Sequence, residues 1–536
     1  MRPTTLFFIT IIAILLGGCA STQTPATPTE LPIAQTPTEE LPTETPLPSA
    51  TPVPTATPTQ MPSAEPTEEV LGLPAFEPVT CRFRDAYQYD MECGNLIVPE
   101  DRANPQGPTV KMHVAIIKSS SSNPKPDPVI YISGGGGANH LDGYVRYMRG
   151  GGTEIIRERD YIMYNQRGAK YASPYLFCPG FTELNWDFAG KEISAGDLKS
   201  QVVDFFLDCQ DDLLAEGNNL EAYSTATNAA DLNDLRIALG YEQVNLYGTS
   251  YGTRLILYTL RYFPEGVRSA IIDSVYPPQI NYMGQFAANA VRAFEAIFED
   301  CAADPQCNDR YPNLEAVFYQ TVDALNADPV QVHFDSHDDS MLITGNVLMD
   351  TIYTLFYIVD EIANIPRYIY EASQGDVSRM EWLYPYLPNY DNIAYGVFHS
   401  FQCREQIAFE DENESLALRE GVPQQILDWF SWPPYEVTLC KSWQSGRADP
   451  IDHTPVVSDV PTLVFAGRYD PITPPSWSQL AAQTLSNSFF YEFPGNGHGV
   501  MRDNSCGLEI GLQFINDPTG EPDASCLDEE TPVDFK

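Results

Sequence analysis

The sequence has few basic residues, and this shortage excludes several classes of function. Lysine and arginine together number 30, against 73 aspartates and glutamates, and the formal net charge at pH 7 is −43. DNA, RNA and anionic lipid headgroups all repel a protein of this charge at ordinary ionic strength. We therefore expect no nucleic-acid partner, and the simplest use of the charge is a solvated acidic surface that keeps the protein soluble.

Nucleotide and metal signatures are also missing. The glycine-rich stretch at 134–137 has neither the Gly-Lys-Ser/Thr ending of a phosphate-binding loop nor the spacing of a dinucleotide-binding motif. No two of the cysteines have the Cys-x-x-Cys spacing of zinc and thiol redox sites. We therefore expect an activity that uses no metal and no organic cofactor.

The apolar stretch at the N-terminus, from Leu6 to Leu16, is too short to cross a membrane as a helix. It follows Met-Arg and ends in Leu16-Gly17-Gly18-Cys19, which resembles the signal peptide and lipobox of bacterial lipoproteins. The resemblance implies acylation of Cys19 and an extracytoplasmic protein that is held at the membrane only by this lipid anchor. The alternative is an ordinary cleaved signal peptide in which the cysteine is incidental.

The segment from residue 20 to residue 67 is rich in Thr, Pro, Ser, Ala and Glu and contains no lysine or arginine. Such a composition cannot bury a core, and its repeated Thr-Pro pairs favour extended conformations. We interpret it as a stalk that holds the folded body away from the membrane.

The cysteine count also favours export. Of 11 cysteines, ten remain once Cys19 is set aside, and an even number suits disulfides in an oxidising compartment. Neighbours in the sequence suggest five pairs: Cys81 with Cys93, Cys178 with Cys209, Cys301 with Cys307, Cys403 with Cys440, and Cys506 with Cys526.

Several short apolar runs predict the strands of a central sheet. Residues 96–99 and 110–117 are typical of opening antiparallel strands, whereas 129–132, 161–164 and 244–247 are typical of buried strands. Each of the last three ends in a glycine-bearing loop, and helical patterns alternate with them. This indicates a mostly parallel, doubly wound α/β sheet with its site at the carboxyl ends of the strands.

A helical block interrupts the sheet pattern between about residues 281 and 445, and strand patterns return at 461–465 and 489–493. A helical insertion between two halves of a sheet domain predicts a cap over the active site. The predicted organisation is a lipoprotein signal peptide at 1–18, a stalk at 19–72, a core at 73–280, a helical cap at 281–455 and a C-terminal core part at 456–536.

The motif Gly248-Thr249-Ser250-Tyr251-Gly252 follows an apolar strand and opens a helical pattern. This is the context of a Gly-x-Ser-x-Gly turn, which exposes a nucleophilic serine at the top of a sheet. The glycines matter because side chains in so tight a turn would collide with neighbouring elements. A serine hydroxyl also needs a base within hydrogen-bond reach and a third group that orients the base.

Asp470 and His498 supply that acid and base, because each follows a predicted strand late in the chain. The order Ser250, Asp470, His498 is the chain order of α/β-hydrolase triads. Asp273 also ends a strand and stays an alternative acid. Among the histidines, His140 lies near the glycine loop, where we expect it to line the pocket. The remaining histidines lie in an early strand, in the predicted cap or just before a strand: His113, His333, His337, His399 and His453.

The glycine loop at 134–137 follows a buried strand, at the place where this fold supplies one backbone N–H of an oxyanion hole. The second N–H comes from the residue after the nucleophile, Tyr251. Donors aimed at the developing oxyanion are usually the largest single catalytic contribution.

Taken together, these residues resemble the prolyl-iminopeptidase and tripeptidyl-aminopeptidase group of secreted α/β-hydrolases, specifically members with a tripeptidyl-aminopeptidase-like C-terminal region. The likeness covers nearly all residues after Leu73. Beyond the motifs above it includes Cys93-Gly94, Val98-Pro99, Gln166-Arg167-Gly168 and the closing stretch 518–526. The resemblance implies the α/β-hydrolase fold, a triad of Ser250, Asp470 and His498, and Gly135 as the oxyanion donor of the glycine loop.

Two positions depart from the family pattern. The usual His-Gly-Gly-Pro-Gly is here Ser133 followed by four glycines, and the usual Asp before Gln-Arg-Gly is Asn165. We expect a looser loop and a changed polarity beside the site. Members that remove N-terminal residues hold the substrate's free amine with cap carboxylates, and Glu405 is the candidate here, with an ordinary salt-bridged glutamate as the alternative. Gly136 is expected to contact the substrate.

Three functions follow from these observations. The first is a serine exopeptidase that releases short N-terminal pieces from extracellular peptides through an acyl-enzyme. The second is an esterase or other small-molecule hydrolase on the same triad, because this fold supports many chemistries. The third is a surface-binding lipoprotein that keeps the fold without catalysis.

Overall fold

The computed structural model describes residues 72–191, 193–334, 339–383, 390–431 and 434–536. The predicted signal peptide, the lipidation site Cys19, the stalk up to residue 71 and His337 lie outside the described residues. Among the helices that are described, none combines the length and the apolar composition needed to cross a bilayer.

A nine-stranded sheet, in the order β1-β2-β3-β5-β4-β6-β7-β10-β11, forms the centre of the described fold. The pairs from β1 to β5 along this order are antiparallel, and the pairs from β5 to β11 are parallel. The strands are β1 Ala75–Pro78, β2 Met91–Pro99, β3 Thr109–Ile117, β4 Val129–Ile132, β5 Tyr161–Tyr164, β6 Val244–Ser250, β7 Val267–Val275, β10 Thr462–Gly467 and β11 Ser488–Phe493. The predicted mostly parallel sheet with antiparallel opening strands is confirmed.

Side chains of the parallel strands alternate between two apolar clusters, one on each face of the sheet. One cluster contains Ile130, Ile162, Leu246, Ile272 and Val464. The other contains Val129, Tyr161, Tyr247, Ile271 and Leu463. The first face is covered by α5 (Thr225–Ala238), α6 (Tyr251–Tyr262) and α18 (Pro475–Ala482), and the second by α1 (Tyr144–Tyr147), α2 (Thr153–Ile155) and α19 (Ser505–Asn516).

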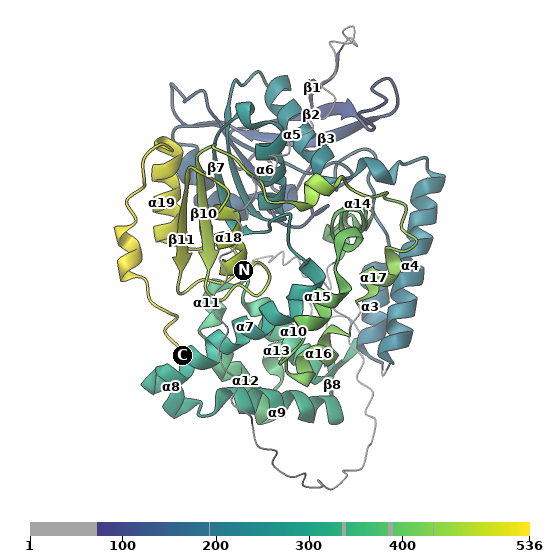
Figure 1. Cartoon of the computed structure of the whole chain (residues 1–536), viewed down its shortest axis with the longest axis vertical. Coiled ribbons are helices and arrows are strands. Elements are labelled where there is room, and N and C mark those ends of the chain that lie inside the picture. Colours follow the sequence, from purple (N-terminus) through teal and green to yellow (C-terminus); the bar gives the residue numbers. More distant parts are fainter. Residues whose placement is uncertain (1–71, 192, 335–338, 384–389, 432–433) are drawn as a thin grey trace, which may run out of the picture. The chain divides into compact units, whose positions relative to one another are not determined.

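A group of helices between β7 and β10 covers the end of the sheet where the parallel strands finish (Figure 1). These helices are α7 Tyr282–Ala303, α8 Pro305–Arg310, α9 Leu314–Ala327, α10 Gly345–Leu355, α11 Val359–Ile362, α12 Ile365–Ser373, α13 Ser378–Leu383, α14 Tyr395–Phe401, α15 Glu412–Ala417, α16 Gln424–Phe430 and α17 Tyr435–Leu439. We call this group the cap. It also contains a hairpin of β8 (Val330–Phe334) and β9 (Asp339–Ile343), which the sequence analysis did not predict.

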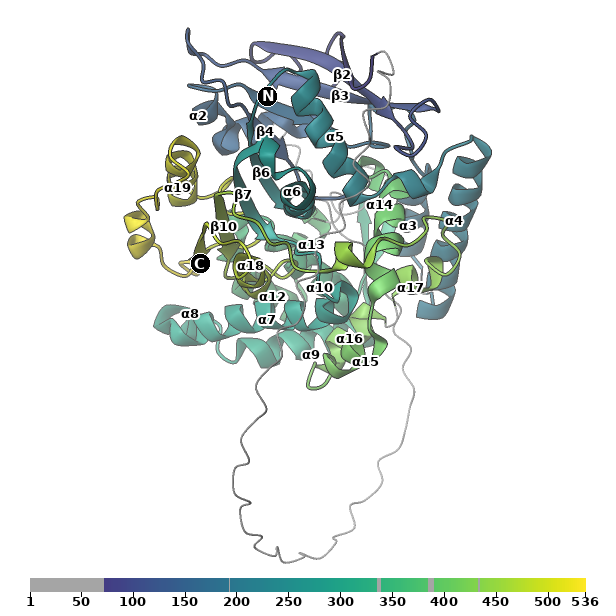
Figure 2. The same ribbon diagram turned by 45° about the horizontal axis from the view of Figure 1, so that its top comes forward.

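Two helices from an earlier part of the chain join the cap. Helices α3 (Phe181–Ala189) and α4 (Ala195–Ala215) lie beside α14 and α17 in both views (Figures 1 and 2). Phe206 of α4 packs its ring against Tyr395, His399 and Tyr435. The helical layer is therefore assembled from two separate stretches of sequence, whereas the sequence analysis assigned residues 181–215 to the core.

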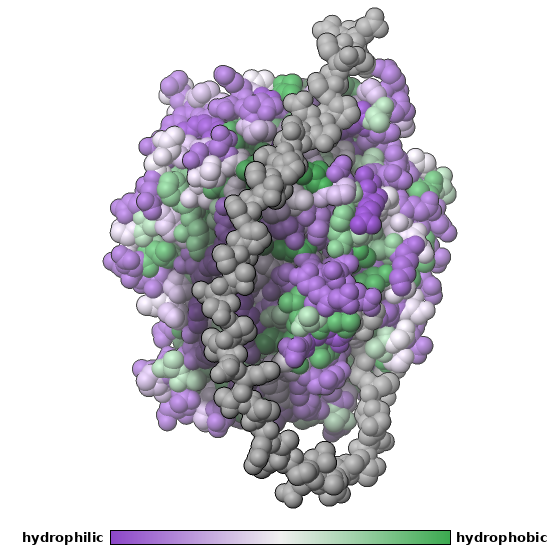
Figure 3. Space-filling view, in the orientation of Figure 1, coloured by the Kyte–Doolittle hydropathy of each residue, from purple (hydrophilic) through white to green (hydrophobic). Residues whose placement is uncertain are grey.

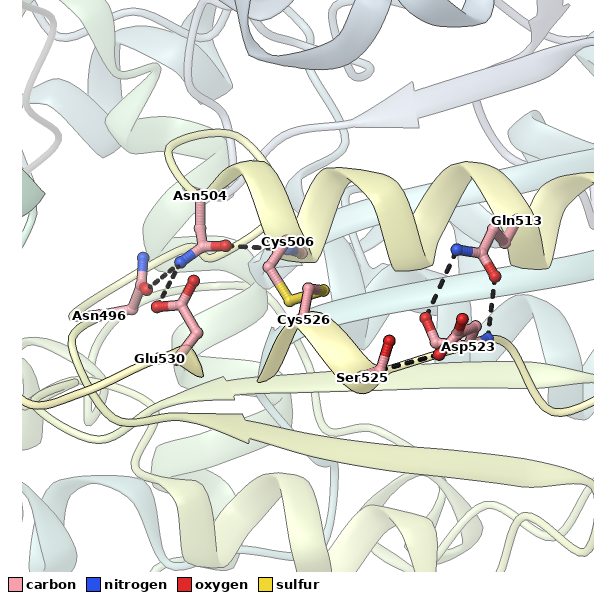
Figure 4. The surroundings of a disulfide bond; sticks show 9 residues. Asn496, Asn504, Cys506, Gln513, Asp523, Ser525, Cys526 and Glu530 are labelled. Atoms are coloured by element: carbon pink, nitrogen blue, oxygen red, sulfur yellow. Dashed lines mark hydrogen bonds between the residues drawn. A yellow bond between two sulfur atoms is a disulfide. The ribbon is translucent and has the colours of Figure 1, made fainter. Parts of the chain in front are cut away.

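All five predicted disulfides are present, with S–S distances of 1.93–2.07 Å. Figure 4 shows the bond between Cys506 and Cys526, which fastens the C-terminal segment to α19. Beside it, the amide of Gln513 bonds the backbone of Asp523 at both its N–H and its C=O. On the face drawn in Figure 3 hydrophilic residues predominate, in keeping with the acidic composition.

Candidate active site

Ser250 occupies a strained turn between β6 and α6. Its φ is 57° and its ψ is −125°, a backbone conformation that is uncommon for any residue other than glycine and clusters at functional sites. The turn is possible only because its neighbours are small. A Cβ on Gly252 would lie 2.0 Å from the carbonyl oxygen of Ile132, and a Cβ on Gly248 would lie 2.9 Å from Gly252 itself. The helix α6 therefore presses directly against β4, and Ser250 projects from the turn.

Ser250 lines a cavity of about 130 Å³ together with His498, Tyr251 and the glycine loop at 134–136. A cavity of this volume is about the size that holds one benzene ring. Aromatic rings from the cap form much of the opposite wall: Tyr282, Tyr357, Tyr395, Phe398, Phe401 and Tyr435. The cavity thus lies between the carboxyl ends of the strands and the cap.

Asp470 and His498 form a hydrogen-bonded pair, with 2.8 Å between Asp470 Oδ2 and His498 Nδ1. The other oxygen, Oδ1, accepts the backbone N–H groups of Ile472 and Thr473, each at 2.9 Å. Burial acts to raise the pKa of Asp470, but the imidazole and these hydrogen bonds outweigh it and hold the pKa below its usual value. The carboxylate therefore stays ionised beside the imidazole.

Thr473 is a further member of this group that the sequence analysis did not identify. Its hydroxyl donates to Asp470 Oδ2 at 2.8 Å and lies 3.2 Å from His498 Nδ1. The position three residues after the acid, in a short turn, is the only trace of this role in the sequence.

Asp273, the alternative acid, binds a different part of the same loop. Its buried carboxylate accepts the N–H of Val500 at 2.9 Å and that of Met501 at 3.0 Å, and the neighbouring Ser274 accepts the N–H of Gly499 at 2.8 Å. Burial raises the pKa of Asp273 to about 6, although the two backbone donors act in the opposite direction. Asp273 therefore anchors the backbone that follows His498, while Asp470 orients the imidazole.

The cap holds both loops that carry Asp470 and His498. The N–H of His498 donates to the carbonyl of Phe356 at 2.9 Å, and the ring of Tyr357 packs edge-on against the imidazole at 4.8 Å between centroids. Arg292 of α7 donates to the backbone carbonyls of Arg468 and Asp470. The imidazole and its carboxylate are thus fixed from the cap as well as from the sheet.

The glycine loop lies against the serine. A Cβ on Gly134 would be 2.7 Å from Ser250 Cβ and 3.3 Å from its Oγ. Gly135 has a φ of 78°, and a Cβ on Gly136 would lie 2.0 Å from the ring of Phe401. Gly135, Gly136 and Tyr251, which the sequence analysis selected, all line the cavity, but Gly134 is the glycine in contact with the serine.

Asn165, at the position where the family has aspartate, fixes the segment that follows the glycine loop. Its Oδ1 accepts the N–H of His140 at 2.9 Å, and its Nδ2 donates to Asn139 and to the carbonyl of Lys170, each at 2.8 Å. A neutral amide suits this position because Asn165 both accepts from an N–H and donates to two oxygens, whereas a carboxylate could only accept. Arg167 is fully buried and pairs with Asp231, at 2.6 and 2.7 Å.

Glu405, the candidate for binding a substrate amine, makes its contacts within the protein. The residue is buried, and its carboxylate accepts the N–H of Thr225 at 2.5 Å and the hydroxyl of the same residue at 2.7 Å. Arg254 of α6 lies 3.3 Å from its Oε2. The described lining of the cavity does not include Glu405. Its carboxylate joins the cap to α5 and α6, so the salt-bridged alternative fits the structure.

The described alternative histidines have other surroundings. His140 lines the cavity, as predicted, and burial lowers its pKa to about 4. His113 is buried in β3 beside Asn95, His399 lies among aromatic rings, and His453 stacks on Phe409. His333 is exposed on β8.

Two arginines, Arg146 and Arg502, also line the cavity. The sequence analysis assigned them no role, because neither belongs to a recognisable motif.

Comparison with known proteins finds similar sequences and structures. Serine protease Hip1 of Mycobacterium tuberculosis is 24% identical over 461 residues, which cover 80% of this chain and 86% of that protein. Tripeptidyl aminopeptidase of Streptomyces lividans is 26% identical over 196 residues, or 35% of this chain and 36% of that one. The crystal structure of proline iminopeptidase from Mycobacterium smegmatis superposes with a TM-score of 0.35 at 15% identity, over 81% of this chain and 98% of that chain.

The family model of the alpha/beta hydrolase fold matches residues 127–504, which is more than half of the chain. The match runs from β4 through the glycine loop, the Ser250 turn and the cap to the loop that follows His498. The chain therefore belongs to the α/β hydrolase fold family.

Proposed function

We propose that this protein is a serine peptidase that acts on short peptides, with Ser250 as nucleophile, His498 as general base and Asp470 as the group that orients it. The observation that carries the proposal is the shared cavity: Ser250 and His498 line it, and Asp470 bonds the far nitrogen of the imidazole. The Hip1 and tripeptidyl aminopeptidase relatives support a peptidase.

The proposed reaction passes through an acyl-enzyme. The hydroxyl oxygen of Ser250 attacks the scissile carbonyl carbon while His498 Nε2 takes the hydroxyl proton. The backbone N–H groups of Tyr251 and of the glycine loop, with Gly135 as the donor, stabilise the oxyanion. His498 then gives its proton to the leaving nitrogen, and the amine departs. In the second half, water attacks the ester while His498 takes its proton, and His498 returns a proton to the Ser250 oxygen as the acid is released.

The size of the cavity supports an exopeptidase. A cavity of about 130 Å³ beneath the cap does not admit a folded polypeptide. The aromatic wall suits an apolar or aromatic residue beside the scissile bond, since rings offer a large apolar contact area. We therefore place cleavage near a chain end, with release of short N-terminal pieces.

A set of p-nitroanilides tests this activity. The purified protein is incubated with aminoacyl and tripeptidyl p-nitroanilides, each with a free and with a blocked N-terminus, beside simple p-nitrophenyl esters. We expect turnover of free-amine peptide substrates and none by Ser250→Ala. Equal or exclusive cleavage of the esters would contradict a peptidase.

An esterase on the same triad is the second candidate function, and one observation favours it. Among the described residues that line the cavity there is no aspartate or glutamate, so the free amine of a peptide finds no carboxylate partner in that wall. Turnover of N-blocked substrates and esters above that of free-amine peptides would support this candidate.

Export and lipid anchoring complete the proposal. The lipobox-like Leu16–Cys19 segment and the five disulfides support an extracytoplasmic protein held at the membrane through its N-terminus. Labelling with a radioactive fatty acid, which Cys19→Ala should abolish, tests the anchor. Absence of label on the wild type would contradict it.

A further inference from the structure

The two walls of the cavity differ in chemistry. The cap contributes aromatic rings, whereas the wall built by β4, α1 and the loop before α19 carries two guanidinium groups, those of Arg146 and Arg502. The described lining residues include no carboxylate. A positively charged wall beside the nucleophile is unexpected in a chain with a net charge of −43.

The guanidinium of Arg502 lies directly behind the turn that carries the base. A Cβ on Gly499 would be 3.6 Å from Arg502 Nη2, and Gly499 follows His498. Arg502 is held by Asp503, whose Oδ2 accepts from its Nε at 2.7 Å. Asp503 also accepts from Arg502 Nη2, so it holds two of the three guanidinium nitrogens.

Arg146 shares the same surroundings. Burial lowers its pKa, repulsion from Arg502 lowers it further, and attraction by Asp503 acts in the opposite direction. Charge interactions are stronger in a partly buried site than in water, so an anion at this wall would be attracted by both guanidinium groups.

His140 adds a neutral donor to the same wall. Within the described structure its Nε2 is buried without a hydrogen-bond partner, while its Nδ1 lies 3.4 Å from the hydroxyl of Tyr147. That hydroxyl is in turn 3.0 Å from Ser133 Oγ. A buried polar atom without a partner is rare in folded proteins, and a water or a ligand in the cavity would satisfy it. The backbone of Gly135 also interacts with this imidazole and acts to raise its pKa. With its proton on Nε2, the imidazole donates to an acceptor in the cavity.

We propose that Arg146, Arg502 and His140 form a subsite for a carboxylate, and that this carboxylate is the C-terminus of the leaving part of a short peptide. The assignment rests on the proposed peptidase function. His498 protonates the leaving nitrogen, so the leaving part lies on the side of the imidazole, and Arg502 lies behind that same turn. Paired donors on guanidinium groups are well suited to carboxylate recognition. The substrates are thus free oligopeptides of a few residues.

Matched pairs of peptides test the subsite. Short peptides with the same sequence and a free N-terminus are compared as C-terminal acids and as C-terminal amides, with the new amine measured after cleavage. We expect the wild type to favour the acid by about tenfold in kcat/KM, mainly through KM, which corresponds to about 1.4 kcal/mol. Equal rates for the two forms in the wild type would overturn the proposal.

Variants locate the effect. Arg146→Gln and Arg502→Gln should each reduce the ratio of acid to amide to within about twofold of unity, and Arg146→Lys should keep part of it. Because the result is a ratio within one enzyme preparation, a general loss of activity does not imitate it. Arg149→Gln is the matched control, since Arg149 is exposed on the same segment, and it should keep both the ratio and the activity. An unchanged ratio in both arginine variants would overturn the assignment.

Two further experiments distinguish a terminal from a side-chain carboxylate, and failure of the subsite from failure of the peptidase proposal. Peptide amides with glutamate or glutamine as the leaving residue show whether a side-chain carboxylate replaces the terminal one, and a preference for glutamate as large as that for the free acid would contradict C-terminal recognition. The p-nitroanilides carry no carboxylate in the leaving group. If the enzyme cleaves the p-nitroanilides but cleaves peptide acids and amides equally well, only the subsite is refuted. If it cleaves no peptide substrate at all, the peptidase proposal is refuted.

Discussion

Replacement of Asp470 by asparagine distinguishes an orienting carboxylate from a merely structural one. Two backbone N–H groups bind Asp470 Oδ1 at 2.9 Å each, so the amide oxygen of the variant must occupy this position. The amide nitrogen then faces His498 Nδ1, which now lies 2.8 Å from an oxygen. An N–H donor at this place forces Nδ1 to accept, and the proton of the neutral imidazole moves to Nε2.

An imidazole with its proton on Nε2 cannot take the proton of Ser250. The loss expected from the wrong tautomer is about 10⁴-fold in kcat, or about 5 kcal/mol of transition-state stabilisation. The fold should survive, because asparagine has the shape of aspartate and keeps both backbone bonds. The assay is kcat and KM on a peptide p-nitroanilide, with far-ultraviolet circular dichroism and thermal unfolding as checks of the fold.

Asp273→Asn is the matched control, because Asp273 is also buried and also lies at the end of a strand. It binds the backbone of Val500 and Met501 rather than the imidazole, so we expect a loss of at most about tenfold in kcat. The reasoning fails if Asp470→Asn keeps more than a tenth of wild-type kcat while folded. It fails equally if Asp273→Asn loses more of the wild-type kcat than Asp470→Asn does.

Three further predictions concern other parts of the molecule. Gly134→Ala should lower kcat by about 10²- to 10³-fold in a folded protein, because the new methyl group would displace the loop from Ser250. The measurement is the rate per active site, with the active sites counted by fluorophosphonate titration. Asp273 has a pKa raised to about 6, so its contribution to stability is complete below about pH 4 and falls by about 3 kcal/mol as the pH rises to 6. In thermal unfolding, the stability of Asp273→Asn relative to the wild type should therefore increase between pH 4 and pH 7. A stability difference that does not change with pH would refute the raised pKa. Loss of the bond between Cys403 and Cys440, which are 37 residues apart, should lower the free energy of unfolding by about 4 kcal/mol in urea titrations of the double serine variant.

Much of the fold could be predicted because local pattern and global structure agree. The apolar runs at 129–132 and 244–247 form buried parallel strands at those residues, and the helix after Ser250 starts where the glycine pattern places it. The helices α3 and α4 were harder to assign, since amphipathic helices look the same whether they cover a sheet face or join a cap. Only long-range packing, such as the contact of Phe206 with Tyr435, decides between the two.

The candidate site shows the same division. Chain order and loop position selected Asp470 and His498, since these properties are local. The contact of Glu405 with Arg254 could not be predicted, because Arg254 lies 151 positions earlier and the burial of Glu405 has no local signature. Arg502 was missed for the opposite reason, since a basic residue in a loop is usually exposed and solvated.

The fastening of the acid and base loops to the cap has a consequence for engineering. Phe356 and Arg292 belong to the cap, yet they hold the backbone of His498 and Asp470 by hydrogen bonds. Exchanging the whole cap for that of another hydrolase would therefore remove the supports of His498 and Asp470 along with the old cavity wall. New selectivity is better sought by altering single rings on the inner surface, such as Tyr282 or Phe398, which leaves those backbone supports in place.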